Sequence, residues 1–100
     1  MGVAEALTEF HTPDKLGADV VLYVTDTCGY CRMAESLLRR RDIAFVAVDV
    51  TELPEARSWL IEKTGRRTVP QIFVKGASIG GFTELAAMDR SGALATALAG

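Results

Sequence analysis

Two uninterrupted apolar runs, separated by one amphipathic stretch, most constrain how this chain of 100 residues can fold. The runs are residues 20–24 (VVLYV) and 43–48 (IAFVAV), and neither alternates with polar residues, which is typical of strands covered on both faces. Between them, apolar residues recur at helical spacing over residues 29–41. Strands joined through a helix pair in parallel with a right-handed crossover. The sequence therefore predicts a βαβ unit.

The patterns on either side of this unit predict two more strands and several helices. Residues 51–63 have helical spacing, with Thr51 as the expected N-cap and Gly65 as the stop. Residues 68–81 predict an antiparallel hairpin with its turn at Lys75-Gly76. Further helical segments are predicted at residues 2–10, 82–88 and 91–99. We therefore expect an α/β fold with a four-stranded mixed sheet in a single domain, residues 1–100.

Charge and composition exclude several classes of function. The net charge is -2, so the chain has no general attraction for nucleic acid or for anionic membranes. No window approaches the roughly 20 apolar residues of a membrane span, and the first residues do not combine a basic segment with a long apolar run. We expect a cytoplasmic protein with neither nucleic-acid nor membrane partners.

Both cysteines lie in the segment Cys28-Gly29-Tyr30-Cys31, between the first predicted strand and the following helix. The free N–H groups and positive dipole end of a helix N-terminus favour a thiolate over a thiol. Cys28 lies at this position and Cys31 lies one turn inside, so we expect Cys28 to be the nucleophile. Structural zinc sites usually have four ligands, and the chain offers only one histidine besides these two cysteines. The motif therefore predicts a redox site.

Three segments together resemble the glutaredoxin family. They are Cys28-Gly29-Tyr30-Cys31, which differs from the family's Cys-Pro-Tyr-Cys by one glycine, then residues 68–73 (TVPQIF) and residues 79–81 (IGG). The resemblance covers residue 19 to the C-terminus and implies a thioredoxin-like fold. Residues 1–18 are then an extra N-terminal helical segment, and residues 19–100 are the glutaredoxin-like core.

The resemblance implies glutathione as the ligand and glutathione disulfides as substrates. The family's lysine three residues before the first cysteine is Thr25 here, and we expect Arg66 and Arg67 to supply the missing cation. Glu84 stands where the family usually has an aspartate for the ligand's amino group. A cis bond is expected between Val69 and Pro70. The expected binding residues are Thr25, Thr27, Tyr30, Arg66, Arg67, Thr68, Val69, Pro70, Gly81, Phe82, Thr83 and Glu84.

Three functions follow from these residues. In the first, a monomer reduces glutathione mixed disulfides and protein disulfides, with Cys28 as nucleophile and Cys31 as resolving thiol. In the second, Gly29 favours a homodimer in which Cys28 thiolates and two glutathiones hold a [2Fe–2S] cluster for storage or transfer. In the third, the threonine at position 25 favours an electron donor that thioredoxin reductase reduces.

Overall fold

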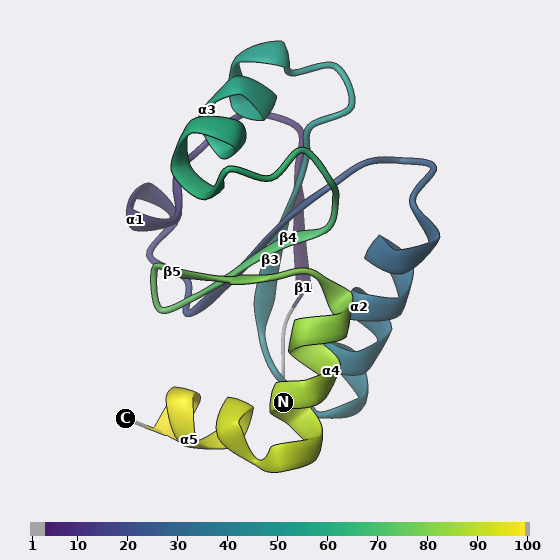
Figure 1. The fold of residues 1–100 in the computed structure, drawn as a ribbon, viewed down its shortest axis with the longest axis vertical. Helices are drawn as coiled ribbons and strands as arrows, with labels where there is room; N and C mark the ends of the chain where they lie inside the picture. The colour runs from purple at the N-terminus through teal and green to yellow at the C-terminus, as the bar shows by residue number, and fades with distance from the viewer. Residues whose placement is uncertain (1–3, 100) are drawn as a thin grey trace.

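A five-stranded mixed sheet forms the centre of the computed structural model, which describes residues 4–99 (Figure 1). The strand order is β1-β3-β2-β4-β5. Strands β1, β3 and β2 are parallel, whereas β4 is antiparallel to β2 and β5 is antiparallel to β4. The strands are β1 (Ala4–Leu7), β2 (Val20–Val24), β3 (Phe45–Asp49), β4 (Gln71–Val74) and β5 (Ala77–Gly80).

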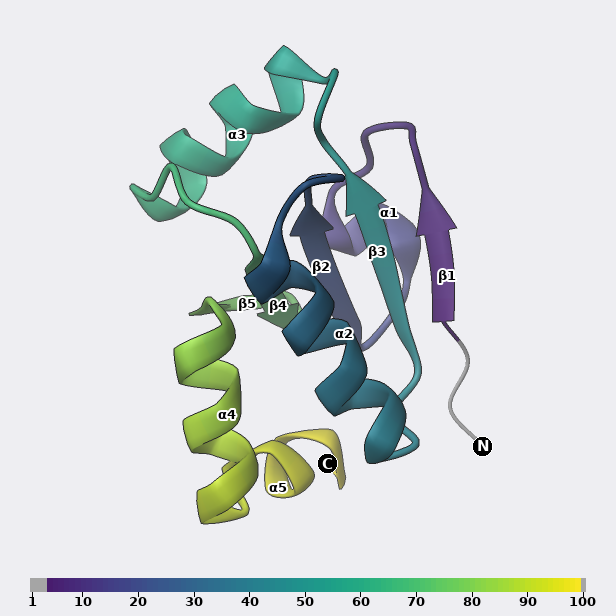
Figure 2. The same cartoon turned by 90° about the vertical axis from the view of Figure 1, so that its right-hand side faces the viewer.

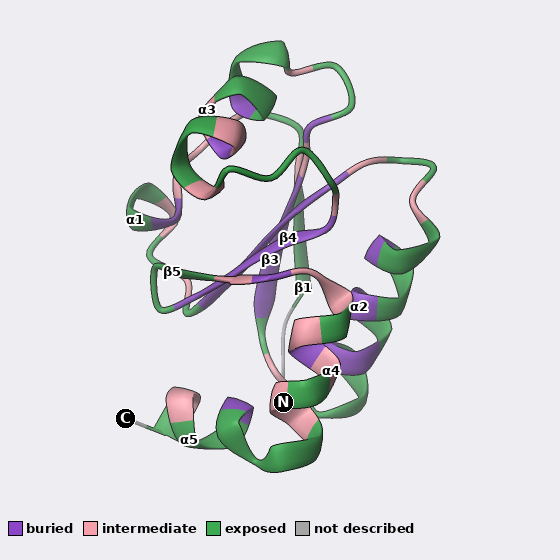
Figure 3. Ribbon diagram, viewed as in Figure 1, coloured by how far each residue is buried: buried purple, intermediate pink, exposed green. Residues whose placement is uncertain are grey.

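Helices cover both faces of this sheet (Figure 2). Successive β2 residues point to opposite faces, so Leu22 packs with α2, α4 and α5, while Val21 and Tyr23 pack with α3. All five β2 residues are buried, as the uninterrupted apolar run predicts (Figure 3). The helices are α1 (Pro13–Leu16), α2 (Gly29–Arg40), α3 (Pro54–Thr64), α4 (Phe82–Ser91) and α5 (Ala93–Ala99).

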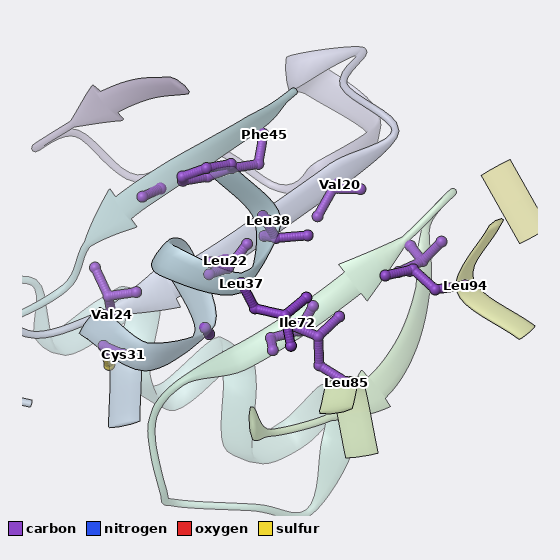
Figure 4. Close-up of a cluster of buried hydrophobic side chains, with 13 residues drawn as sticks. Val20, Leu22, Val24, Cys31, Leu37, Leu38, Phe45, Ile72, Leu85 and Leu94 are labelled. Carbon is purple, nitrogen blue, oxygen red and sulfur yellow. The ribbon is translucent and has the colours of Figure 1, made fainter. Parts of the chain in front are cut away.

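The core on the α2 side joins the element that carries the cysteines to the rest of the fold. Leu37 and Leu38 of α2, Ile72 of β4 and Leu85 of α4 come together around Leu22 (Figure 4). Cys31 belongs to this cluster and has no exposed surface. Burying several side chains of this size stabilises the position of α2 by about 2 kcal/mol each. The start of α2 is therefore fixed relative to β4 and α4.

The N-terminal prediction was wrong in its secondary structure. Residues 4–7 form strand β1 and not part of a helix, and a short helix begins at Pro13, where the predicted helix should have ended. Ala6 and Leu7 do recur at helical spacing with Phe10, but the exposed edge of β3 offers a backbone pairing partner, with Ala4 opposite Phe45. The sheet consequently has five strands and not four. Residues 2 and 3 of the predicted helix lie outside the described residues.

The helix predicted at residues 51–63 begins later than expected. Helix α3 starts at Pro54 with Leu53 as N-cap, and Thr51 does not cap it. The Thr51 side chain instead bonds with Asp49 and with the backbone of Asp26. The stop at Gly65 is confirmed, with a left-handed backbone conformation at φ 74°. The turn at Lys75-Gly76 between β4 and β5 is also confirmed. No helix within residues 4–99 is long and apolar enough to cross a membrane.

Candidate active site

Cys28 and Cys31 lie at the start of α2, shortly after the end of β2. Cys28 is the N-cap of α2 in an extended conformation, and its Sγ accepts a hydrogen bond from the Cys31 N–H at 3.1 Å. The two side chains form a disulfide, with their Cα atoms 5.2 Å apart. Cys28 is partly exposed, whereas Cys31 is buried. The pair therefore has one sulfur that meets solvent and one that lies inside the fold.

The segment before β4 faces Cys28. Its Val69–Pro70 bond is cis, as expected, and Pro70 is buried. The Cys28 Sγ lies 3.6 Å from the Val69 carbonyl oxygen. Antiparallel pairing of β4 with β2 places the residues before Gln71 beside the residues after Tyr23. Sheet topology alone thus brings two segments about forty residues apart into contact at the cysteines.

A groove of about 260 Å³ runs beside this contact. The side chains of Tyr30 and Phe82 form one wall, with their ring centroids 6.2 Å apart. Tyr30 is 62% exposed, so its ring offers a large apolar surface to a ligand. The lining consists entirely of residues expected at the site: Tyr30, Arg66, Thr68, Val69, Pro70, Gly81, Phe82, Thr83 and Glu84.

The beginning of α4 lines part of the groove. Glu84 Oε1 accepts a hydrogen bond from the Gly81 N–H at 2.7 Å and lies 3.5 Å from Arg66 Nη1. The Gly81 N–H, and to a smaller extent the Arg66 guanidinium, hold the pKa of Glu84 below its usual value. Gly80 has φ 110°, which residues with a side chain rarely adopt, and a Cβ there would lie 2.6 Å from this carboxylate oxygen, so glycine is favoured at this position. An ionised carboxylate, paired with Arg66, therefore lines the groove.

A second, smaller pocket of about 210 Å³ adjoins the groove and is lined by three arginines, Arg57, Arg66 and Arg67. It shares Arg66 and Val69 with the groove. Arg57 was not among the residues expected at the site, although its position three and four residues before Leu60 and Ile61 puts it on the same face of α3 as these two residues. Three guanidinium groups around one small pocket favour a carboxylate.

A buried amide fixes the loop that carries two of these arginines. Gln71 is 3% exposed, and its Nε2 donates to the Arg66 carbonyl oxygen at 2.8 Å. Its Oε1 lies 2.8 Å from the Thr64 hydroxyl, which also accepts a hydrogen bond from the Arg66 N–H. Burying an amide without partners would be costly, so these bonds hold the backbone of Arg66 in one position.

Two of the expected binding residues do not line either pocket. The side chains of Thr25 and Thr27 line neither the groove nor the arginine pocket. The Thr25 carbonyl oxygen instead accepts a hydrogen bond from Arg32 Nη2 at 3.4 Å. Within residues 4–99, no group of three or more His, Cys, Asp or Glu side chains is placed to hold a metal ion.

This arrangement defines a class of protein. A dithiol after the central strand, next to a cis-proline segment that opens the following hairpin, belongs to thiol–disulfide oxidoreductases with a thioredoxin-like fold. The glutaredoxin family model matches residues 20–79. The chain belongs to the glutaredoxin family, and the resemblance of its sequence motifs is confirmed.

Individual relatives agree with this assignment. Glutaredoxin 3 of Escherichia coli is 38% identical over 77% of this chain and 93% of its own length. A glutaredoxin of Pseudomonas aeruginosa is 40% identical over 75% of this chain and 89% of its own. The crystal structure of a buckwheat glutaredoxin–glutathione complex is 26% identical, with a TM-score of 0.78 over 83% of this chain and 78% of that chain.

Proposed function

We propose that the protein is a glutathione-dependent oxidoreductase that reduces glutathione mixed disulfides and protein disulfides through Cys28. One observation carries this proposal: Cys28 Sγ lies 3.6 Å from the carbonyl oxygen of Val69, a residue that lines both the groove beside Glu84 and the pocket of three arginines. Glutathione carries a thiol, two carboxylates and an amino group, and the site offers a cysteine, arginines and a carboxylate that match these groups. The buckwheat glutaredoxin of similar fold is described in complex with glutathione.

Each end of the ligand has a matching group in this proposal. Arg57, Arg66 and Arg67 bind one carboxylate, and the Val69 backbone pairs with the extended peptide. The backbone N–H groups of Phe82 and Thr83, at the start of α4, face the second carboxylate. Glu84 supplies the negative charge for the ligand's amino group. The ring of Tyr30 covers the cysteinyl sulfur in the middle of the ligand.

The reaction exchanges one disulfide for another. The Cys28 thiolate attacks the glutathione sulfur of a mixed disulfide, the Cys28–glutathione bond forms, and the substrate leaves as a thiolate that takes a proton from water. A second glutathione thiolate then attacks the glutathione sulfur on Cys28. This step releases oxidised glutathione and returns the Cys28 thiolate, so each turnover consumes one free glutathione, and the substrate supplies the other half of the oxidised glutathione.

Cys31 acts when the substrate is a protein disulfide. Cys28 attacks one sulfur, and Cys31 then attacks Cys28 to release the reduced substrate and leave the Cys28–Cys31 disulfide. Two glutathiones reduce that disulfide in turn. Because Cys31 is buried and donates its own N–H to Cys28 Sγ, it is placed to resolve but not to attack first.

Serine substitutions of the two cysteines test these roles. We expect Cys28→Ser to abolish reduction of a glutathionylated protein by glutathione and its reductase, whereas Cys31→Ser keeps most of that activity but loses reduction of protein disulfides. Reduction of the glutathionylated protein is measured by labelling its bound glutathione and following the release of the label. Equal loss in both variants contradicts the assignment of Cys28. Reduction of the parent protein by thioredoxin reductase and not by glutathione contradicts the proposed reductant.

A further inference from the structure

The three residues before Cys28 form an exposed loop that is fastened to the end of β3. The Thr51 hydroxyl oxygen accepts a hydrogen bond from the Asp26 N–H at 3.0 Å. The same hydroxyl donates its only proton to Asp49 Oδ1 at 2.6 Å, and the Thr51 N–H donates to the same oxygen at 2.9 Å. The Asp49 carboxylate thus orients the hydroxyl so that its lone pairs face the loop.

Backbone hydrogen bonding nearby holds the end of β2 but not the loop that follows it, so the side-chain bond supplies a separate restraint. The Val50 N–H donates to the Val24 carbonyl oxygen at 2.8 Å, which fixes the last residue of β2 but not the residues after it. Arg32 reaches the Thr25 carbonyl oxygen at 3.4 Å, but its guanidinium is half exposed and also pairs with Glu35. Asp26 is therefore held chiefly through the hydroxyl of Thr51.

We propose that Thr51 is a positioning residue that acts through Asp26 to hold Cys28 in its reactive geometry. Cys28 is two residues after Asp26, and as a thiolate its Sγ must keep the hydrogen bond from the Cys31 N–H and its contact with the Val69 segment. Both contacts depend on the angle at which the loop enters α2. This inference rests on the proposed role of Cys28. It assigns a part in the reaction to Thr51, which lines neither pocket.

The test is the rate at which iodoacetamide alkylates the fully reduced protein. In this reaction the Cys28 thiolate forms a carbon–sulfur bond and iodide leaves, so neither glutathione nor its binding site takes part. Thr51→Val removes one hydrogen bond between a side chain and the backbone. The free energy lost with this bond should slow alkylation about threefold. Thr51→Ser keeps the hydroxyl and should restore the parent rate. Thr96→Val, a change in α5 far from the loop, is the matched control.

Each outcome decides between positioning and simple loss of stability. Equal alkylation rates in Thr51→Val and the parent overturn the proposal. A slow rate in Thr51→Ser that equals the valine rate also overturns it, because the hydroxyl would then not be the cause. Mass spectrometry identifies the alkylated cysteine: reaction at Cys31 contradicts the proposed function, whereas reaction at Cys28 at an unchanged rate contradicts only the role of Thr51.

Amide hydrogen exchange gives a second measurement that does not depend on how well the valine variant folds. In the parent protein, the Asp26 N–H should exchange more slowly than expected for an exposed loop, because it is bonded to Thr51. Thr51→Ser should keep this protection. An Asp26 amide that exchanges in the parent at the rate of an unprotected peptide overturns the proposal.

Discussion

Glu84 shows how one residue can serve both the fold and the site. Its carboxylate caps the start of α4 through the Gly81 N–H and pairs with Arg66, and one oxygen makes both contacts. The pKa of Glu84 is lowered from its ordinary value of 4.5 by these groups. A group with a lowered pKa in the folded state stabilises the protein above its unfolded pKa, and this contribution is lost as the pH falls through the lowered pKa.

Replacing Glu84 with glutamine should therefore have an effect that depends on pH. We expect Glu84→Gln to lower the melting temperature at neutral pH, and we expect this deficit to shrink as the pH falls through the lowered pKa of the parent carboxylate, which then also becomes neutral. Melting curves of both proteins at neutral pH and over a series of acidic pH values measure the difference. Glu62→Gln, on the exposed side of α3, is the control. A deficit of equal size in acid would show that the charge of Glu84 contributes nothing.

Helix α3 matters to the site because it carries an arginine toward it. Its inner residues Ala56 and Leu60 are buried against the sheet, and Arg57 of the same helix lines the arginine pocket. Trp59 packs against Phe10 and Phe73, with ring centroids 5.7 and 5.9 Å apart, which fixes the rotation of the helix. The place of Arg57 is thus set by core packing and not by the loop that carries the other two arginines.

Removing this one charge should weaken substrate binding without slowing the chemical step. We expect Arg57→Gln to raise the KM for a small glutathione mixed disulfide about fivefold and to leave kcat unchanged, because it loses one charge-assisted hydrogen bond to a carboxylate. Steady-state kinetics measure both constants. Arg40→Gln removes the same charge from the exposed end of α2 and is the control. A KM that rises equally in both variants would reflect net charge and not this pocket.

At the scale of the whole molecule, the N-terminal residues complete the sheet and cover one core. Strand β1 occupies the edge of β3, and Leu7, Phe10 and Leu16 pack against the cluster around Tyr23. The Tyr23 hydroxyl, which is buried, donates to the His11 carbonyl oxygen. The N-terminal segment therefore shares a core with the part of the chain that matches the family model.

Deleting residues 1–18 should leave a less stable protein that associates with itself. The deletion uncovers apolar surface around Trp59 and exposes the backbone of β3 as a new sheet edge, which can pair with another chain. We expect a lower melting temperature and a concentration-dependent increase in size on gel filtration. An unchanged melting temperature in a deletion variant that elutes as the parent does would show that residues 19–100 fold independently of the extension.

The sequence predicted the parts of this fold that depend on local pattern. Buried β2 followed from five consecutive apolar residues, and the cysteine site followed from its place between a strand and a helix. The strand at residues 4–7 could not be predicted in this way, because pairing with β3 decides its conformation. Arg57 was not predicted because an arginine on a helix is usually solvated. Thr25 lines neither pocket, and sequence alone does not tell which way a loop side chain points.

The burial of Cys31 beside a partly exposed Cys28 also determines what peroxide does to this protein. An exposed thiolate is oxidised to a sulfenic acid, and further oxidant converts that group irreversibly to a sulfinic acid. In this fold Cys31 is close enough to condense with the sulfenic acid of Cys28, with loss of water, to give the disulfide of the structure. The buried sulfur of Cys31 thus protects the sulfur of Cys28 from irreversible oxidation, and thiols can reduce the disulfide that forms.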